Sequence, residues 1–260
     1  MQTKRLKLCV PVLCIITAAC ELTAGDIVVA DGMDYSNSRQ LNSVWKTMYG
    51  LSSVKNAITF EAQSLAGTRP APASGTVLVL GNAISHRELG ATLKEDWVLS
   101  AKILHKSYGR GQGIYLLNEA GTQGYGILWN SANVSQFAGN GFLSIRRFDN
   151  ANYKDWPSFG VGTQLGREAN SQHPVTGYCV TKLSSADQNT ATYETAAWND
   201  FLTVELHWSA TEGTLRLYAN GKFITQAADN SFSEFSRIYL RGNSDGYFDD
   251  IQVSTGSEKK

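Results

Sequence analysis

The chain has 260 residues, with 23 Lys and Arg against 23 Asp and Glu, and only 18% of its residues are charged, below the usual share of about 25%. This balance argues against nucleic acid as a partner, because phosphate binding depends on clustered Lys and Arg. A hydrophobic share of 42% with six Trp excludes wholesale disorder. Gly is plentiful at 24, Pro is scarce at 5, and long helical periodicity is missing, so we expect sheets joined by tight turns.

Residues 1–24 are typical of an export leader. Met1 to Lys7 is basic, and the apolar run Leu8 to Ile16 is too short to cross a bilayer, which needs about 20 residues. Two interpretations of its end stay open: plain cleavage, or lipid attachment at Cys20, which follows Ala-Ala as in bacterial lipoproteins although Thr17 replaces their usual aliphatic residue. We expect a secreted, periplasmic or cell-surface protein with no transmembrane segment and with Cys20 as a candidate lipid anchor.

Cys179 is the only cysteine in the body of the chain. An exported domain without a disulfide must be held by its own core, and this chain is long enough for that. Because no His lies close to Cys179 in the sequence, we interpret it as a buried strand thiol and not as a nucleophile.

Apolar and polar residues alternate with a period of two in a series of segments, which predicts strands. The predicted strands are residues 76–80, 97–104, 113–117, 124–130, 142–147, 201–208, 214–219, 222–227, 237–241 and 247–253. Asn220-Gly221 separates two of them and predicts a type I′ hairpin, because both residues tolerate positive φ.

The number and length of these strands predict an all-β fold, a two-sheet antiparallel β-sandwich or jelly roll. No strand alternates with a long amphipathic helix, which disfavours a parallel α/β sheet. We expect a single domain over residues 25–253, followed by a polar tail at residues 254–260.

Two motifs in the last third of the chain carry a resemblance to a known family. Trp208 to Lys222 (WSATEGTLRLYANGK) and Phe248 to Ile251 (FDDI) resemble the C-terminal half of concanavalin A-like lectin/glucanase domains of the laminin G-like (LamG) kind. Residues 87–100 look like that family's paired early strands, and Gly124 to Trp129 fits the same pattern. The likeness runs from about Asp31 to Val253 and implies the concanavalin A-like fold. It implies no single activity, because that superfamily includes lectins, adhesive modules, glycoside hydrolases and polysaccharide lyases.

The hydrolases of this superfamily carry paired acids on one strand in the pattern E-x-D-x-x-E. Retaining hydrolysis needs two carboxyls about 5–5.5 Å apart, and the sequence contains no such triplet. Its nearest cluster is Asp245, Asp249 and Asp250, and regular alternation would send the last two to opposite faces. The sequence therefore disfavours retaining hydrolysis by the family's mechanism.

A polysaccharide lyase needs a Tyr or His base together with Arg or Lys that neutralises a uronate carboxylate. Tyr115 or His105 with Arg146 and Lys102 are the candidates, since alternation turns Tyr115, Arg146 and Lys102 away from the core. The alternative interpretation is an ordinary solvated sheet face.

Aromatic side chains are the other sugar-binding candidates, because the apolar face of a pyranose packs on a flat ring. Tyr115, Tyr125 and Trp129 lie on predicted strands, and Trp156 lies in a Gly- and Asn-rich region. Together with Arg146 they form the predicted carbohydrate-binding set, although Trp129 suits the core equally well.

Calcium is the one metal that the sequence suggests. Asp31 and Asp34 near the start could meet Asp249 or Asp250 if the first and last strands pair, and hard oxygen ligands would suit a structural Ca²⁺. The His spacing matches no zinc motif.

The leading hypothesis is an exported, non-catalytic carbohydrate-binding module whose partner is a polysaccharide or glycan. A polysaccharide lyase or other glycan-active enzyme on the same fold is the first alternative. A surface adhesive or structural protein anchored through Cys20 is the second.

Overall fold

The computed structural model describes residues 25–56, 76–105, 112–130, 141–151, 163–165, 179–180, 201–242 and 246–256. The predicted leader with Cys20 and the loop residue Trp156 lie outside this part of the chain. Within it, every strand ladder is antiparallel and one short helix is present. None of its helices has the length and apolar character that a membrane crossing requires.

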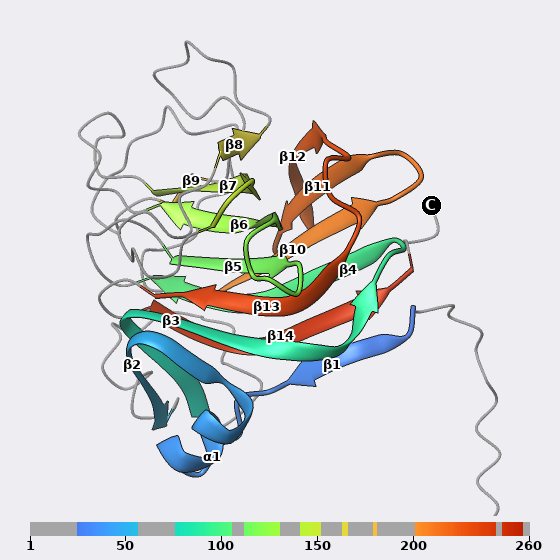
Figure 1. Ribbon diagram of the computed structural model, residues 1–260. Coiled ribbons are helices and arrows are strands. Elements are labelled where there is room, and N and C mark those ends of the chain that lie inside the picture. The colour runs from blue at the N-terminus through green and yellow to red at the C-terminus, as the bar shows by residue number, and fades with distance from the viewer. Residues whose placement is uncertain are drawn as a thin grey trace, which may run out of the picture.

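Fourteen strands and the helix α1 (Ser38–Val44) make up the described fold. The strands are β1 (Ile27–Asp31), β2 (Lys46–Asn56), β3 (Thr76–Leu93), β4 (Trp97–His105), β5 (Gln112–Leu117), β6 (Gly124–Asn130), β7 (Gly141–Phe148), β8 (Thr163–Leu165), β9 (Cys179–Val180), β10 (Leu202–Ser209), β11 (Thr214–Ala219), β12 (Lys222–Ala228), β13 (Phe235–Arg241) and β14 (Gly246–Thr255). Their order is β12-β11-β10-β4-β14-β3-β13-β5-β6-β7-β8, with β1 beside β14, β2 beside β3 and β9 beside β7 (Figure 1).

The long strand β3 divides this sheet into two facing layers. Its residues 78–80 pair with β14, whereas its residues 84–93 pair with β13. Between them Asn82 has a φ of 41°, so the strand turns there. The sheet therefore folds over, and β11 and β12 curl toward β7 (Figure 1).

The main core fills the space between the layers. Inward residues of β4 and β10, such as Trp97 and Leu206, pack with those of β6 and β13, such as Ile127 and Phe235. The rings of Trp97 and Phe235 meet edge to face with their centroids 5.2 Å apart. This arrangement confirms the predicted all-β class with two antiparallel layers.

Helix α1 begins and ends on local signals. The side chain of Asn37 accepts hydrogen bonds from the backbone N–H groups of Arg39 and Gln40 at the N-terminus, as an N-cap residue does. Leu41 is its buried residue, and extended backbone at Trp45 ends it. The helix was not predicted from the sequence, and a strand was expected near the start of the chain without bounds for β1 or β2.

The predicted strands after residue 75 are all present, with three differences in extent or pairing. Asn220 and Gly221 have φ values of 49° and 74°, which confirms the predicted hairpin turn. However, β3 is 18 residues long, and β14 continues to Thr255, inside the predicted tail. The early strands at residues 87–100 belong to β3 and β4, which do not pair with each other because β14 lies between them.

Candidate functional site

One face of the β3-β13-β5-β6-β7 layer carries two of the predicted site residues. Residues opposite each other in a ladder point to the same side of a sheet. The register aligns one such row across the layer: His86, Tyr239, Tyr115, Gly126 and Arg146. Tyr115 and Tyr239 belong to a small cluster separate from the main core. The prediction that Tyr115 and Arg146 point away from the core is therefore correct.

The predicted exposure of these two side chains is wrong. Tyr115 is 0% exposed and Arg146 is 6% exposed. The Tyr115 ring lies over two glycines of the sheet. A Cβ placed on Gly126 would come within 2.3 Å of the ring, and one on Gly113 within 1.7 Å of its hydroxyl oxygen. Phe148 meets the same ring edge to face, with centroids 4.7 Å apart. Tyr115 is thus a packed ring and offers no open platform to a sugar.

The charge environment of Tyr115 also bears on the lyase hypothesis. Burial raises the pKa of its hydroxyl, although the nearby charges of Arg241 and Arg146 act in the opposite direction. A general base must be deprotonated at the working pH, so this shift makes Tyr115 a poor base near neutrality.

The other members of the predicted lyase set lie elsewhere. Lys102 is on β4, and the strands β14, β3 and β13 separate β4 from β5. His105 is the last residue of β4, and its side chain lies outside the described part. The structure therefore does not bring Lys102 together with Tyr115 and Arg146.

Tyr125 and Trp129 face the main core and are both 0% exposed. Tyr125 donates its hydroxyl hydrogen to Oδ1 of Asp229 at 2.5 Å and accepts a hydrogen bond from the backbone N–H of Phe232 at 3.2 Å. The predicted role of Tyr125 as an exposed sugar platform is wrong, and of the two roles left open for Trp129 the core role is the one observed, because strand alternation turns both rings inward. Trp156, the last predicted aromatic residue, is outside the described residues.

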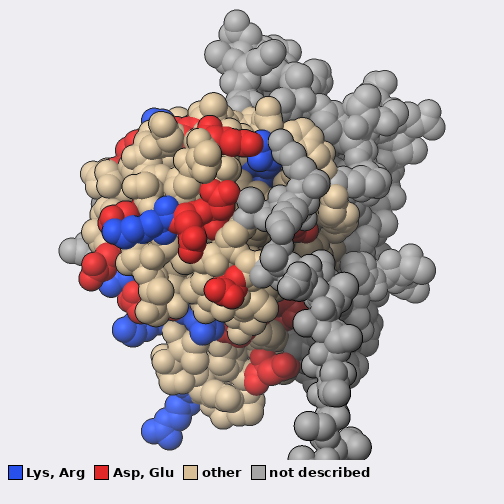
Figure 2. Space-filling view, turned by 90° about the vertical axis from the view of Figure 1, so that its right-hand side faces the viewer, with Lys and Arg blue, Asp and Glu red and all other residues tan. Residues whose placement is uncertain are grey.

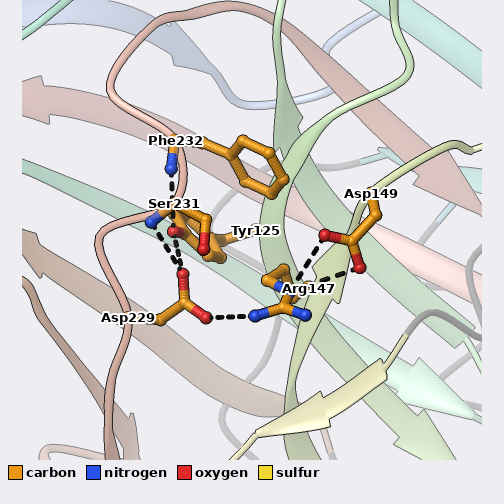
Figure 3. Close-up of polar contacts among 6 residues, drawn as sticks. All are labelled: Tyr125, Arg147, Asp149, Asp229, Ser231 and Phe232. Carbon is orange, nitrogen blue, oxygen red and sulfur yellow. Dashed lines mark hydrogen bonds and ion pairs between the residues drawn. The ribbon is translucent and has the colours of Figure 1, made fainter.

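Asp229 joins Tyr125 to a second polar side chain (Figure 3). Its Oδ2 lies 2.7 Å from Nη1 of Arg147, whose Nε lies 3.2 Å from Oδ1 of Asp149. Burial alone would raise the pKa of Asp229, but hydrogen bonds from Tyr125, Ser231 and Arg147 outweigh it and lower the pKa. This group, the Asp229 clamp, holds the β12–β13 connection against β6 and β7, and its role is structural.

The calcium prediction rests on the pairing of the first and last strands, and that pairing is present, with Asp31 opposite Ile251. The Asp31 carboxylate, however, already accepts four hydrogen bonds. The donors are the N–H of Met33, the hydroxyl of Tyr35, Nε1 of Trp45 and Nη1 of Arg87. Within the described ranges, no three or more His, Cys, Asp or Glu side chains are grouped so as to hold a metal ion. The ligand set Asp31, Asp34, Asp249 and Asp250 stays a prediction.

A cavity of about 310 Å³ opens on the outer face of the other layer, within the usual range for small-ligand sites. Its lining residues come mainly from β1, β14, β4 and β10, which are neighbours in the sheet (Figure 1). Its lining residues are Ala30, Asp31, Gly32, Ser100, Ala101, Lys102, Thr203, Asp250, Ile251 and Gln252. We name it the Lys102–Asp250 cavity.

A β-bulge shapes this cavity. Asp249 pairs with Lys102 and Gln252 with Ser100, so two residues of β14 stand against one of β4. Asp250 lies in the bulge with a φ of 45°, and its Oδ2 is 2.7 Å from Nζ of Lys102. The prediction that Asp249 and Asp250 face opposite sides is therefore wrong, because a bulge breaks the alternation and re-aims the side chain.

The environments of the two acids differ. Asp249 is 0% exposed, and its Oδ1 accepts a hydrogen bond of 2.9 Å from the backbone N–H of Asp250, which helps to hold the bulge. The Asp250 side chain is 29% exposed and that of Lys102 is 20% exposed. Solvent, and hence a ligand, can reach this ion pair. A non-glycine residue at positive φ is strained, and such strain is commonly found at functional sites.

The cavity offers donors and acceptors in about equal measure. Lys102 can donate, Asp250 can accept, and Ser100, Thr203 and Gln252 can do both. Ser100, Thr203 and Gln252 could not be grouped from the sequence, because they lie on three strands whose pairing was not known. The adjacent acids of the last strand were the one available signal.

Comparisons with known proteins provide no family assignment. No family model matches the chain, and no curated protein matches it. Among solved structures it is similar to the carbohydrate-binding module CBM66 from Bacillus subtilis, with a TM-score of 0.47, 14% identity, and coverage of 81% of this chain and 95% of that one.

Two further solved structures show a likeness of the same degree. The legume lectin-like domain from Entamoeba histolytica has a TM-score of 0.46, 12% identity, and coverage of 88% of this chain and 98% of that one. A galectin-like protein of unknown function from Bacillus subtilis has a TM-score of 0.45, 10% identity, and coverage of 91% and 99%. The fold assignment for this chain rests on its own strand pairing.

Proposed function

We propose that this protein binds carbohydrate in the Lys102–Asp250 cavity. The observation that carries the proposal is the bulge at Asp250, where a residue with a strained backbone holds its carboxylate beside an ammonium group in an open cavity. A sheet that needed only to be soluble would gain nothing from a strained residue there, since a regular ladder would avoid its cost.

Sugar hydroxyls suit this lining because each one can donate and accept a hydrogen bond. The carboxylate of Asp250 accepts from hydroxyls, the ammonium of Lys102 donates to them, and hydrogen bonds with charged partners are the stronger kind. The two charges balance within the pair, so a neutral sugar fits better than a strongly charged ligand. On the face shown in Figure 2, acidic and basic side chains are likewise interspersed, with no field of a single sign.

The proposed role is to bind a sugar without cleaving it. Glycoside hydrolysis uses two carboxyl groups across the scissile bond. Of the two acids that line the cavity, Asp31 is engaged by four donors, which leaves Asp250. The basic and apolar leader supports export to the cell surface, the periplasm or the medium.

A glycan array, probed with the protein purified from an exporting host, tests the proposal. We expect retention by at least one glycan, and a loss of tenfold or more in affinity for Asp250→Asn and for Lys102→Met. Lys94→Met is the matched control, because Lys94 forms an ion pair with Glu234 at an exposed position. Ultraviolet absorbance of unsaturated products, recorded on the same glycans, would reveal lyase activity. Absence of retention, or full retention by the Asp250 and Lys102 variants, would refute the proposal.

A further inference from the structure

The Lys102–Asp250 cavity lies at one end of a longer row of outward residues. The register aligns six residues, one from each of β1, β14, β4, β10, β11 and β12: Ala30, Gln252, Ser100, Glu205, Tyr218 and Phe223. Because residues aligned in this way share a face, the cavity side of the sheet continues past Glu205 to two aromatic rings. The first three members line the cavity, and the last three lie beyond it.

The aromatic end of the row is open. Phe223 is 54% exposed, and its ring meets that of Tyr218 at an interplanar angle of 73° with centroids 5.8 Å apart. The Tyr218 ring also contacts the ring of His207, with centroids 4.6 Å apart. An exposed phenyl ring gains little from folding, since it is not removed from water.

A second bulge sets the direction of Phe223. The register of the β11–β12 ladder shifts between Leu217, which pairs with Thr225, and Tyr218, which pairs with Phe223. The extra residue, Ile224, packs against the main core, while Phe223 turns outward beside Tyr218. The fold thus uses a bulge at each end of the row to direct a side chain to the same face.

The middle of the row is polar. The Glu205 side chain is 27% exposed, and its Oε2 lies 3.0 Å from Nε2 of His207. A ligand that leaves the cavity along the row would meet a hydrogen-bonding stretch first and the rings afterwards. Neighbouring strands lie about 4.8 Å apart, so the three steps from β4 to β12 amount to about 14 Å, more than one sugar ring covers.

We propose that the Lys102–Asp250 cavity and the Tyr218–Phe223 pair are two subsites for one neutral oligosaccharide that runs across the strands. The cavity binds the hydroxyls of one unit, and Phe223 packs against the apolar face of a later unit, as aromatic side chains do with pyranose rings. This inference rests on the proposed function, since it needs the cavity to bind sugar.

Titration calorimetry on the full exported protein tests the inference with cellohexaose, mannohexaose and xylohexaose and with glucose, mannose and xylose as probes. We expect a hexasaccharide to bind more tightly than its monosaccharide. Phe223→Ala should weaken the hexasaccharide about 3- to 10-fold and leave the monosaccharide unchanged, whereas Asp250→Asn should weaken both. Phe223→Trp should restore the hexasaccharide affinity. Tyr49→Ala, which removes a ring that is also exposed but lies outside the row, is the matched control.

The outcomes separate the inference from the proposed function. Unchanged hexasaccharide binding by Phe223→Ala, with loss in Asp250→Asn, would overturn the second subsite and leave the cavity in place. No binding of any probe by the unaltered protein, or binding that Asp250→Asn does not weaken, would overturn both. Melting curves of each variant establish that a loss of affinity does not come from unfolding.

Discussion

Lys102 stands opposite Asp249 in the ladder between β4 and β14, yet its ammonium binds the carboxylate of the next residue, Asp250. The positive φ of Asp250 makes this possible. Glycine tolerates such a φ, whereas a β-branched residue does not. Asp250→Gly should therefore change the free energy of unfolding by less than about 1 kcal/mol, because relief of strain offsets the loss of a partly exposed ion pair.

Asp250→Val is the variant to compare with Asp250→Gly, and it should lower the free energy of unfolding by about 2 kcal/mol. Urea unfolding of both variants checks the pair, and equal stabilities would contradict the left-handed bulge. Both variants lack the carboxylate, so both should lose sugar binding, which separates the role of Asp250 in the ligand site from its effect on stability.

The Asp229 clamp should contribute to stability through its buried carboxylate. The Asp229 side chain is 6% exposed and binds both Tyr125 and Arg147. Asp229→Asn should lower the free energy of unfolding by about 2–3 kcal/mol, because hydrogen bonds to a charged group are lost. Asp149 is the acid on the other side of Arg147, and its side chain is 55% exposed. Asp149→Asn should lower the free energy of unfolding by less than about 0.5 kcal/mol. Denaturant unfolding at pH 7 compares the two variants. Equal losses of stability would show that the Asp229 carboxylate contributes no more than an exposed one.

The Asp229 carboxylate should also make the stability of the protein depend on pH in the acid range. Since the pKa of Asp229 is lowered in the folded protein, its contribution is complete above the unfolded pKa near 3.9 and is lost as the pH falls toward the folded value. We expect the stability difference between the unaltered protein and Asp229→Asn to shrink below about pH 4. Unfolding curves from pH 6 to pH 3 measure this, and a difference that stays constant would contradict it.

His86 should give a second pH dependence, at a higher pH. Burial lowers its pKa, as does the charge of Arg237, and Lys46 acts in the same direction while Glu88 opposes it. The unfolded chain therefore takes up a proton near pH 6.5 that the folded chain does not, and stability falls as the pH drops from about 7 to 5. His86→Phe keeps a ring against Tyr239, on which His86 stacks, and should flatten this fall. Urea unfolding at pH 7, 6 and 5 measures the free energy of unfolding of both proteins. An equal fall with pH in the two would contradict the prediction.

Gly126 should be required by the Tyr115 ring. A methyl group there would come within 2.3 Å of the ring and 2.4 Å of the carbonyl oxygen of Ile114. Gly126→Ala should cost about 2 kcal/mol or more through overpacking. Gly81→Ala is the control, because a Cβ at that strand position would have no atom within 4 Å. Thermal unfolding should show a lower melting temperature for the first variant only.

The class of the fold could be predicted from the sequence because the alternation is regular where the strands are half-buried. In β10 every second residue, from Leu202 to Trp208, is buried, and Asn220-Gly221 has the backbone that its residue types favour. The strand β3 was underestimated because it bends at residues 81–82, where two exposed residues interrupt its pattern. The first strands carry no comparable pattern, and β1 depends on β14, far along the chain, for its pairing.

The site was harder to predict, for two physical reasons. Alternation gives the direction of a side chain but not its depth: Tyr115 points away from the main core and is still buried, because Gly113 and Gly126 leave room for its ring to lie flat. Alternation also fails at a bulge, and both Asp250 and Phe223 owe their direction to one. Neither bulge has a glycine to mark it, so the sequence carried no sign of them.

Strand β3 belongs to both layers as one continuous length of backbone. Unfolding of either layer would remove hydrogen-bonding partners from β3, which is also part of the other layer. The two layers should therefore unfold together. We therefore expect chemical denaturation to follow a single transition with coincident fluorescence and circular dichroism curves, and folding to be slow, because ladders between distant segments must close together.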